Sequence, residues 1–456
     1  MHLPGEDTIT AIATALAIGQ GGIAVIRISG PDAISASKRV VTIKGKKEWR
    51  THTIMYGHVK DNKTDLLIDE ILVLVMRSPR SFTGEDVVEI HCHGGVVAIQ
   101  QILEIILENP KVRRALPGEF SQRAVLNGRI NLTQAEAISD LISARSKHAA
   151  AIATSGLDGG IQRQIDSLRD RIVEQLSEIE ARIDFEEDLP PLNNNKVISE
   201  IKNIEKALTK LIEESKQNIY YRNGIKIAII GAPNAGKSSL LNLLSKNDKA
   251  IVTSIPGTTR DILENNIIID GVPICILDTA GIRQTKDAIE REGILRTKKA
   301  IKYADVVILI FDLKIGWTIN EDKMLSLIPE NTARIIIGNK IDIIQKTDSL
   351  EKVKHDILMS SLTGQGEEDL NKYLLKICGI NRNINIQASL NERQIDLAIE
   401  ANAALSKINE MVSQEMPFDF WTIYLREAIK LLGEITGQDI TEVLLDRIFS
   451  RFCIGK

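Results

Sequence analysis

The residues with the clearest chemistry are 231–238, which read Gly-Ala-Pro-Asn-Ala-Gly-Lys-Ser. This run fits the phosphate-binding pattern G-x-x-x-x-G-K-[ST], in which glycines let the backbone wrap phosphate groups and backbone N–H groups donate to them. The pattern predicts that Lys237 reaches the β- and γ-phosphates and that the Ser238 hydroxyl binds Mg²⁺. An apolar strand-like run precedes it and an apolar helical run follows it, as the pattern requires.

Three further motifs follow in the order of a GTP-binding domain. They are Asp278-Thr279-Ala280-Gly281, Asn339-Lys340-Ile341-Asp342 and Ser360-Ser361-Leu362. Asp278 is predicted to hold Mg²⁺ through water, and the Gly281 N–H to sense the γ-phosphate. Asp342 can accept hydrogen bonds from N1–H and the exocyclic amino group of guanine. Adenine lacks this donor pair, so the set predicts selection of GTP.

The segment 253–261, Thr-Ser-Ile-Pro-Gly-Thr-Thr-Arg-Asp, lies between the first two motifs and is predicted to be switch I. Thr259 is its natural second Mg²⁺ ligand. Ile282 stands where a Ras-type GTPase has its water-orienting glutamine, so hydrolysis needs another source of assistance.

Three residues are candidates for that assistance. Asn234, with switch I carbonyls, could hold a monovalent cation in the place of an arginine finger, or it could simply stabilise the turn. Arg283 could act as an arginine finger in cis. Glu290 could position water directly or through a second water.

The elements that must position these motifs follow from apolar patterning. Near-continuous Ile and Val runs predict strands at 225–230, 274–277, 306–311 and 334–337, alternating with helices as in a parallel sheet covered on both faces. The first 120 residues or so predict a small α+β domain, with strands at 23–26 and 71–75 and a helix at 99–107.

Helical spacing flanks the nucleotide motifs on both sides. A capping box is predicted at Thr133–Glu136. Seven branched residues spaced by threes and fours over 161–183 predict one face of a long helix that ends at Pro190-Pro191. Helical spacing returns after about 388. The simplest architecture is an α/β domain inserted between two parts of one helical domain.

Composition limits the class of protein. A length of 456 residues suggests roughly three domains. The net charge of −4 means that any RNA contact must be local. Four scattered cysteines argue against a disulfide framework or a structural zinc site and predict a reducing compartment. The sequence has no membrane-length apolar run and no signal-peptide pattern, so a cytoplasmic protein is predicted.

Several signatures together resemble the MnmE (TrmE) family of tRNA-modifying GTPases over essentially the whole length. They are Gly-Gly-Ile-Ala-Val-Ile-Arg-Ile-Ser-Gly-Pro at 21–31, Ser-Phe-Thr-Gly-Glu-Asp at 81–86, Pro-Gly-Glu-Phe-Ser at 117–121, Gln-Ala-Glu-Ala at 134–137, Gly-Thr-Thr-Arg-Asp at 257–261, and the closing Arg-Ile-Phe-Ser-Arg-Phe-Cys-Ile-Gly-Lys at 447–456. The resemblance implies a multidomain α/β fold. Its parts would be an N-terminal α+β tetrahydrofolate-binding and dimerisation domain at 1–120, a discontinuous α-helical domain at 121–218 and 383–456, and an inserted Ras-like P-loop GTPase domain at 219–382.

The resemblance also implies an activity. The protein would be a homodimeric, potassium-activated GTPase that works with the FAD protein MnmG (GidA) in a heterotetramer or larger complex. That complex would add a (carboxymethyl)aminomethyl group to C5 of wobble uridines in certain tRNAs, using 5-formyl- or methylene-tetrahydrofolate as the one-carbon source, with GTP, Mg²⁺ and K⁺.

Matched positions carry the family's site residues onto this chain. The predicted nucleotide contacts are Asn234, Ala235, Gly236, Lys237, Ser238, Ser239, Thr253, Ser254, Ile255, Pro256, Gly257, Thr258, Thr259, Asp278, Thr279, Ala280, Gly281, Asn339, Lys340, Asp342, Ser360, Ser361 and Leu362. The predicted Mg²⁺ ligands are Ser238, Thr259 and, through water, Asp278; the predicted K⁺ ligands are Asn234, Thr253, Ile255 and Thr258. The predicted folate contacts are Arg27, Glu89, Arg129 and Lys456, and the predicted catalytic residues are Glu290, Lys237, Thr258 and Cys453.

Some positions depart from the family pattern. Arg129 stands where a lysine is expected, which keeps the charge but changes the hydrogen-bond geometry. The loop 14–22 lacks the usual Pro-Pro-Gly and is longer. Cys453 is either a functional thiol or a small buried hydrophobic residue.

Two other classes of function compete with the modifying enzyme. One is a regulatory or ribosome-assembly GTPase, although no basic G-x-x-G loop of a KH-type module follows the nucleotide motifs. The other is a folate-binding scaffold with an idle GTPase, which the intact Lys237, Ser238, Asp278 and Asp342 disfavour.

Overall fold

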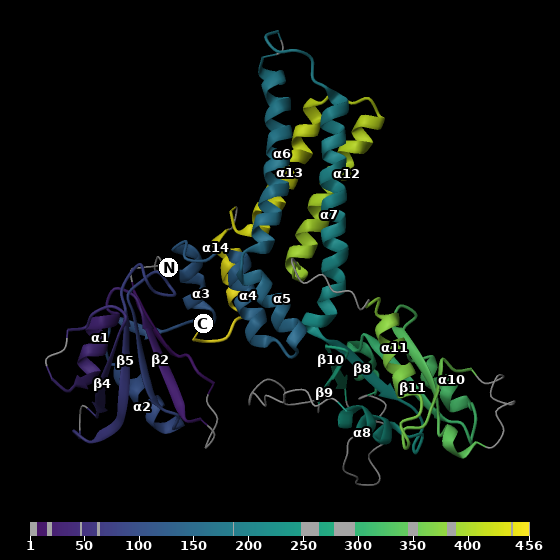
Figure 1. Ribbon diagram of the computed structural model, residues 1–456, viewed down its shortest axis with the longest axis horizontal. Coiled ribbons are helices and arrows are strands. Elements are labelled where there is room, and N and C mark those ends of the chain that lie inside the picture. The colour runs from purple at the N-terminus through teal and green to yellow at the C-terminus, as the bar shows by residue number, and fades with distance from the viewer. Residues whose placement is uncertain are drawn as a thin grey trace. The chain divides into compact units, whose positions relative to one another are not determined.

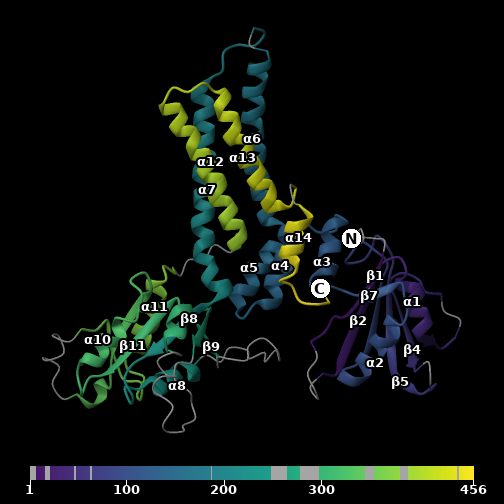
Figure 2. The same cartoon turned by 180° about the vertical axis from the view of Figure 1, so that it is seen from behind.

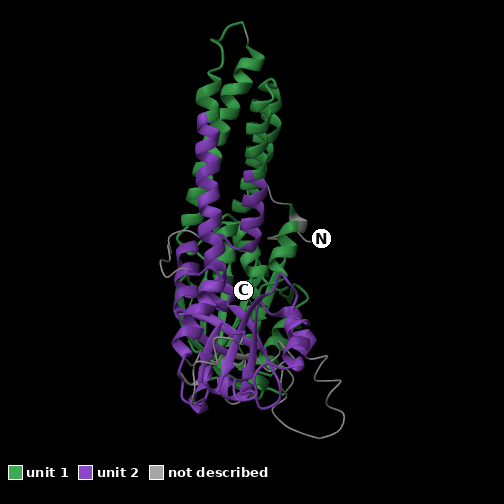
Figure 3. Ribbon diagram, turned by 90° about the vertical axis from the view of Figure 1, so that its right-hand side faces the viewer, with its two compact units in different colours: residues 1–139, 157–198, 403–456 green, residues 140–156, 199–402 purple. Residues whose placement is uncertain are grey.

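The structure is a computed structural model that describes residues 7–15, 21–45, 48–61, 64–185, 187–247, 264–277, 297–344, 354–380, 389–438 and 441–455. The chain divides into two compact units (Figure 3). Unit 1 holds residues 1–139, 157–198 and 403–456, and unit 2 holds residues 140–156 and 199–402. Among the described residues, no helix is both long and apolar enough to span a lipid bilayer.

Unit 1 contains a seven-stranded sheet with the order β3-β4-β5-β6-β2-β1-β7 (Figure 1). Its strands are β1 (Thr8–Ile12), β2 (Ile23–Ser29), β3 (Val41–Ile43), β4 (Thr53–Lys60), β5 (Leu67–Met76), β6 (Val87–His93) and β7 (Val112–Arg114). Neighbouring strands are antiparallel, except that β7 runs parallel to β1. The strands predicted at 23–26 and 71–75 are therefore confirmed, and each extends beyond its predicted run.

Helices α1 (Ala33–Val40) and α2 (Val96–Leu107) cover one face of this sheet. Alternate strand residues such as Ile26, Val73 and Ile90 pack with the buried side of α2 in one apolar cluster. This alternation is what a half-covered sheet requires, because successive side chains point to opposite faces. The helix predicted at 99–107 is confirmed as part of α2.

Further along the chain, unit 1 is helical. Its helices include α3 (Glu119–Leu126), α6 (Gly160–Asp184), α13 (Asp419–Thr436) and α14 (Glu442–Phe449), and α4 (Leu132–Ser143) begins in it. Helices α6 and α13 pack along each other, and both views show them side by side (Figures 1 and 2). Helices that precede and follow residues 199–402 in the chain thus form one helical assembly, as the sequence predicted.

Two details of the predicted helices are wrong. Six of the seven branched residues of α6 are buried, but Ile183 is exposed, because the helix ends at Asp184 rather than at the proline pair. The capping box lies two residues earlier than predicted. The Asn131 side chain accepts from the Gln134 N–H, and the Gln134 side chain accepts from the Asn131 N–H.

Unit 2 contains a six-stranded sheet with the order β13-β12-β11-β8-β10-β9. Its strands are β8 (Ile225–Ile230), β9 (Glu264–Ile269), β10 (Val272–Leu277), β11 (Val306–Asp312), β12 (Ala333–Asn339) and β13 (Ile357–Met359). All neighbouring strands are parallel except β9, which runs antiparallel to β10 at the edge. This is the strand order of a Ras-like nucleotide-binding domain. The four predicted strands are confirmed; β9 and β13 were not predicted.

Helices cover both faces of this second sheet. On one face, α8 (Lys237–Asn247) and α11 (Glu367–Ile377) supply the buried leucines that pack on the sheet. On the other, α10 (Ile319–Leu325) and the helical residues 297–303 pack against alternate strand residues. All seven residues of β11 are buried, which explains its unbroken apolar run from Val306 to Phe311.

The long helices α7 (Asn194–Asn223) and α12 (Glu392–Ser413) run from one unit into the other in the chain, and α5 (Lys147–Leu157) lies almost wholly within unit 2. Within unit 2, α7 and α12 are joined where Asn402 Nδ2 donates to Thr209 Oγ1 at 3.1 Å. Helix α5 lies against the turn between β9 and β10, because a Cβ added at Gly271 would be 2.1 Å from His148 Nδ1. The His148 ring also contacts Tyr221 of α7 in a tilted arrangement, with centroids 5.5 Å apart.

Candidate functional site

The phosphate loop is shaped by three unusual backbone positions. It begins where β8 ends, at Gly231, at which an added Cβ would lie 2.2 Å from the Ile310 carbonyl oxygen. Asn234 has a left-handed φ of 63°. Gly236 has a φ of 107°, and a Cβ there would lie 2.1 Å from Asn339 Nδ2. Both glycines are therefore required by close approach, which explains the spacing of the motif.

Lys237 lies at the first residue of α8, and its ammonium group turns back across the loop. Its Nζ donates to the carbonyl oxygens of Gly231 at 2.8 Å and Ala232 at 2.9 Å. Burial lowers the pKa of Lys237, because the desolvated ammonium is less favourable than it is in water. The ammonium group is thus held against carbonyl oxygens of the loop that the motif predicts for phosphate binding.

Asn339 ties the phosphate loop to the base-recognition motifs. This side chain is 2% exposed. Its Nδ2 donates to the Ala235 carbonyl oxygen at 2.8 Å, and its Oδ1 accepts from both the N–H and the hydroxyl of Ser361 at 2.9 Å. One amide therefore joins the end of β12, the phosphate loop and the loop after β13.

Lys340 and Asp342 follow Asn339 with different surroundings. Lys340 has a left-handed φ of 69°, and its Nζ bonds Asp312 Oδ2 at 2.7 Å, at the end of β11. Asp342 lies exposed in a 3₁₀ turn over Ile341–Ile343. Sequence reasoning missed Asp312. Its signal was an acidic residue directly after the buried apolar run 306–311.

The loop after β13 is closed by its own backbone. Ser360 N–H donates to the Gln365 carbonyl oxygen at 2.9 Å, and Gly364 N–H donates to the Ser360 carbonyl oxygen at 2.9 Å. Ser360 and Ser361 are buried, whereas Leu362 is 82% exposed. The structure thus brings Asn234–Ser239, Asn339, Lys340 and 360–361 into one connected frame.

The other predicted nucleotide residues lie outside the described residues. They are 253–259, 278–281 and Glu290, together with Ile282 and Arg283. Only their place in the chain is fixed by the fold: β9 begins three residues after switch I, and β10 ends directly before Asp278.

A second cluster of predicted residues lies in unit 1, on the face of the sheet opposite α1 and α2. Arg27 of β2 and Glu89 of β6 are direct cross-strand partners, and Arg27 Nε donates to Glu89 Oε1 at 2.9 Å. The guanidinium carbon lies 5.7 Å from the Phe82 ring centroid and 5.6 Å from that of Phe120. Both phenylalanines belong to sequence signatures, but their contact with Arg27 was not predicted.

The C-terminal tail meets the same cluster. Arg27 NH1 donates to the Gly455 carbonyl oxygen at 3.4 Å, and the Gly118 N–H donates to the Cys453 carbonyl oxygen at 3.3 Å. Cys453 is exposed, so its alternative as a buried hydrophobic residue is wrong. Lys456 lies outside the described residues. Arg129 reaches the cluster indirectly, because its Nε donates to the Ser81 carbonyl oxygen at 3.3 Å, next to Phe82.

A buried ion network supports this cluster. Arg123, whose side chain is 3% exposed, contacts Asp7 at 2.7 Å, Glu119 at 3.1 Å and Glu85 at 3.2 Å. Burial opposes ionisation of Glu119, but hydrogen bonds from Arg113 and the Leu116 N–H outweigh it and lower the pKa of Glu119. Glu85 also accepts from Ser29 of β2 at 2.7 Å. The network therefore fixes the segments that carry Phe82 and Phe120.

Comparison with known families accounts for almost the whole chain. The family model described as the GTP-binding protein TrmE N-terminus matches residues 8–129, and that of the MnmE helical domain matches residues 132–453. The chain belongs to the MnmE family of tRNA modification GTPases. Family membership agrees with the resemblance inferred from the sequence signatures.

Individual MnmE proteins match from end to end. The tRNA modification GTPase MnmE of Prochlorococcus marinus (strain MIT 9303) is 54% identical over 460 residues, covering 100% of this chain and 99% of the relative. That of strain NATL1A is 56% identical, with 99% of each chain covered. That of Synechococcus sp. (strain CC9605) is 53% identical, with 100% of each chain covered. The chain is thus a GTPase of the MnmE family over its full length.

Solved structures match in part. A variant of Era from Aquifex aeolicus bound to GDP·AlF₄⁻ is 27% identical with a TM-score of 0.28, covering 40% of this chain and 66% of that chain. The G domain of the FeoB iron transporter of T. maritima is 30% identical with a TM-score of 0.26, covering 34% of this chain and 98% of that chain. The Ras-like assignment for this MnmE-family chain rests on its own strand order.

Proposed function

We propose that this chain is a potassium-activated GTPase that acts with an FAD-dependent partner of the MnmG (GidA) type. Together they would convert C5 of the wobble uridine in certain tRNAs to a (carboxymethyl)aminomethyl group, using a tetrahydrofolate one-carbon unit. The observation that carries the proposal is the end-to-end match to tRNA modification GTPases in a chain whose phosphate loop and base loop are tied by Asn339.

The nucleotide part assigns a role to each motif. Lys237, which is half-buried and bonded to the phosphate loop, would contact the β- and γ-phosphates when GTP binds. Ser238, Thr259 and, through water, Asp278 would hold Mg²⁺. Asp342 would accept from guanine, and its exposure in the 3₁₀ turn leaves it accessible to a base.

Hydrolysis would be assisted by K⁺ in place of an arginine finger. Asn234, which is exposed in a left-handed turn of the loop, would bind the cation together with Thr253, Ile255 and Thr258. A cation there would offset negative charge developing near the bridging oxygen. Glu290 would position the attacking water.

The folate part uses the cluster in unit 1. Arg27, Glu89, Arg129 and Lys456 would contact the cofactor, and cationic groups suit its anionic glutamate tail. Half-buried Phe82 beside Arg27 gives the cluster an apolar side suited to a flat ring, whereas Phe120 is fully buried and supports Arg27 from within the domain. Cys453 would act close by, since its carbonyl group bonds Gly118, two residues before Phe120.

A homodimer is supported by the uncovered face of the N-terminal sheet. Tyr56 of β4, Leu72 of β5 and His91 of β6 are successive cross-strand neighbours on this face. Tyr56 is 44% exposed, and Leu72 is 43% exposed. Ile54 and Ile23 on the same face are also largely exposed. A row of large apolar side chains on one sheet face suits a protein contact.

The first experiment compares GTP turnover in KCl and NaCl at equal ionic strength. We expect potassium to raise the rate by roughly 10²-fold and Asn234→Ala to abolish the increase, because a transition-state contact is lost. Asn203→Ala, in α7, is the matched control. Equal rates in both salts would indicate that Arg283 or an external activator, rather than K⁺, stabilises the charge that develops in the transition state.

The second experiment tests the biological reaction. The gene is deleted, and tRNA nucleosides are measured by mass spectrometry with and without the plasmid-borne wild-type gene. Loss and recovery of wobble-uridine modification is the expected result. Unchanged wobble uridines together with defective ribosome assembly would support the regulatory GTPase instead.

A further inference from the structure

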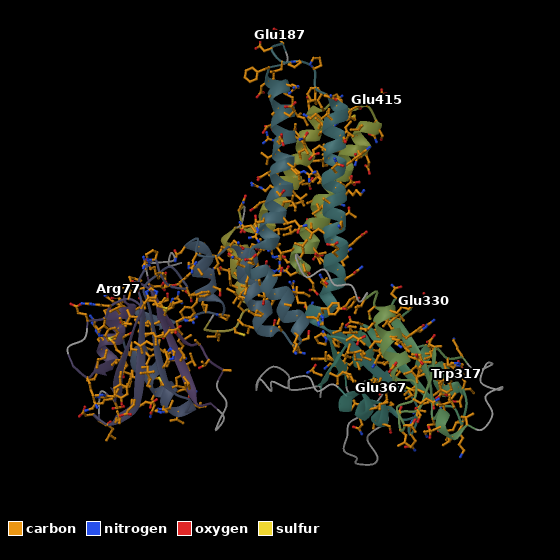
Figure 4. All side chains as sticks on the ribbon, in the orientation of Figure 1. Arg77, Glu187, Trp317, Glu330, Glu367 and Glu415 are labelled. Atoms are coloured by element: carbon orange, nitrogen blue, oxygen red, sulfur yellow. The ribbon has the colours of Figure 1, made fainter. Side chains whose placement is uncertain are left out.

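A hollow of about 820 Å³ lies at the β3–β4 side of the N-terminal sheet, away from the Arg27–Glu89 cluster on β2 and β6. Its lining residues are Lys38, Glu48, Trp49, Arg50, Thr51 and Arg77. They come from the end of α1, the β3–β4 connection and the residue after β5. Figure 4 labels Arg77, whose side chain projects from the surface of the domain. We call this feature the basic hollow.

In the sequence, positive charge is concentrated in the segment that supplies most of the lining of the hollow. Residues 38–50 contain six Lys or Arg and one Glu, whereas residues 1–120 as a whole contain 14 Lys or Arg and 14 Asp or Glu. The chain as a whole is acidic, with a net charge of −4. A cationic stretch within a neutral domain attracts an anionic partner to one location.

The cationic groups are held in position by neighbouring residues. The Arg77 N–H donates to Thr51 Oγ1 at 3.0 Å, and Arg77 NH2 donates to the Trp49 carbonyl oxygen at 3.3 Å. The Arg77 side chain is nevertheless 48% exposed. Lys38 Nζ lies 5.7 Å from the Trp49 ring centroid. Three elements thus present their cations to one concavity around an indole ring.

Acidic groups around the hollow leave a positive balance. Glu48 pairs with Arg50 at 2.8 Å, both side chains being about three-quarters exposed, and Asp86 lies 3.8 Å from Arg77. Exposed ion pairs of this kind contribute little to stability, so another anion can readily replace the carboxylate beside the arginine. Lys38 and the exposed Arg39 beside it add charge at the C-terminus of α1.

We propose that the basic hollow binds the sugar–phosphate backbone of the tRNA substrate. The proposal rests on the tRNA-modifying function proposed above, and it gives an acidic protein the local RNA contact that such a function needs. Lysine and arginine groups pair with phosphates, and an indole beside them offers a surface for an unstacked base. A concave site fits a strand of RNA better than it fits the flat surface of an anionic membrane.

The test measures binding of an unmodified tRNA transcript to the purified full-length protein by fluorescence anisotropy over a fourfold range of KCl concentration. The variant is Lys38→Ser/Arg50→Ser/Arg77→Ser. The charge-matched control is Lys323→Ser/Lys372→Ser/Lys376→Ser, which removes three exposed lysines of α10 and α11. Because Arg77 also bonds Thr51 and Trp49, Lys38→Ser/Arg50→Ser is made beside the triple variant, and thermal unfolding checks that each protein folds.

Each lost phosphate contact lowers the slope of log K against log salt by about 0.7–0.9. We therefore expect the triple variant to lower the slope by about 2 and to weaken binding at low salt by tenfold or more, and the double variant to give about two-thirds of the change in slope. The control should follow wild type. Trp49→Ala should weaken binding without changing the slope, since stacking carries no charge.

Three results would overturn the proposal. They are wild-type affinity and slope in both hollow variants, an equal loss in the control, and loss of binding to phosphatidylserine vesicles while tRNA binding stays intact. Any of these can occur while the wild-type gene still restores wobble modification in the deletion strain. Failure of that restoration would instead count against the proposed function.

Discussion

At the scale of single residues, the nucleotide frame depends on one buried amide. Both polar atoms of the Asn339 side chain are hydrogen-bonded, Nδ2 to Ala235 and Oδ1 to Ser361. Because Gly236 has no Cβ, it leaves room for Asn339 Nδ2. A buried amide with all partners in place is rigid, and displacing it leaves polar groups unsatisfied at about 1–3 kcal/mol each. The site is therefore sensitive to a single added carbon atom.

Gly236→Ala should weaken GDP and GTP binding by roughly tenfold or more. The added Cβ would lie 2.1 Å from Asn339 Nδ2 and must push the amide away from Ala235. Titration with a fluorescent guanine nucleotide measures the loss. Gly316→Ala is the control, because it shares a positive φ, 81°, but has nothing within 4 Å of the added carbon. Equal nucleotide affinities in the two variants would show that backbone strain alone matters.

The sequence predicted which residue types form this frame, but it did not predict which of those residues contact one another. The motifs identified Asn339 and Ser361 because guanine recognition needs those types at those positions. The bond from Asn339 to Ala235 joins positions 104 residues apart, and no local pattern encodes it. In the same way, resemblance predicted Arg27 and Glu89, but the rings of Phe82 and Phe120 around Arg27 are known only from the structure.

At the scale of elements, α3 is tied to the strands by the ion network of Arg113, Arg123, Glu119 and Asp7. The pKa of Glu119 lies below its ordinary value of 4.5, so its ionised form is favoured in the folded state. This stabilisation is complete above that value and is lost as pH falls through the folded-state pKa. Glu119→Gln should therefore lower Tm most near neutral pH.

The Tm difference between wild type and Glu119→Gln should shrink as pH falls below 4.5, because the protonated glutamic acid then resembles glutamine. Thermal unfolding followed by circular dichroism from pH 3 to pH 8 measures this. Glu104→Gln, at an exposed position of α2, controls for loss of an acid outside the network. A constant difference at every pH would refute the ionic contribution.

Helix α5 and the β9–β10 hairpin give a second prediction at this scale. The turn residue Gly271 has a φ of 83°, and a Cβ there would lie 2.1 Å from His148 Nδ1. Gly271→Ala should destabilise the protein by about 1–3 kcal/mol from the backbone alone, and by more from the displaced ring. Denaturant unfolding measures the total.

A double-mutant cycle separates the two effects of Gly271→Ala. Adding His148→Ala should recover only the part of the lost unfolding free energy that is due to the clash between the new Cβ and the His148 ring. Gly379→Ala, with a φ of 69° and open space around it, gives the backbone part by itself. No recovery in the double variant would mean that the α5 contact with the hairpin contributes nothing.

Elements were predictable where burial is uniform and length is adequate. Buried at every residue except Lys226, β8 occupies the predicted residues 225–230 without a shift. Strand β13 has only three residues, and β9 carries polar Glu264, Asn265 and Asn266, so neither gave a strong apolar run. Helix α7 falls mostly in the predicted helical domain of 121–218 but was not identified as a separate helix, although Val197, Ile201, Ile204, Leu208 and Leu211 show the same spacing as α6.

At the scale of the whole molecule, the chain brings its two ends together within unit 1. Gly455 has a φ of 94°, and a Cβ there would lie 2.5 Å from the Ile12 carbonyl oxygen, so the tail packs tightly on β1. The tail also reaches Arg27, 428 positions earlier in the chain. A folate site built this way requires an intact C-terminus, and the tail meets the uncovered sheet face at its β2 side, through Arg27.

That sheet face gives the last prediction. Ile54→Glu/Leu72→Glu should shift the protein from a dimer to a species with the 50.5 kDa mass of one chain, measured by light scattering behind size exclusion. An unpaired carboxylate buried in an interface costs about 3–5 kcal/mol, which weakens association by more than a hundredfold. Ile319→Glu, at an exposed position of α10, is the control. Dimers that persist in the double variant would place the contact elsewhere, and potassium-dependent GTP turnover by the resulting monomers would show that hydrolysis does not depend on this face.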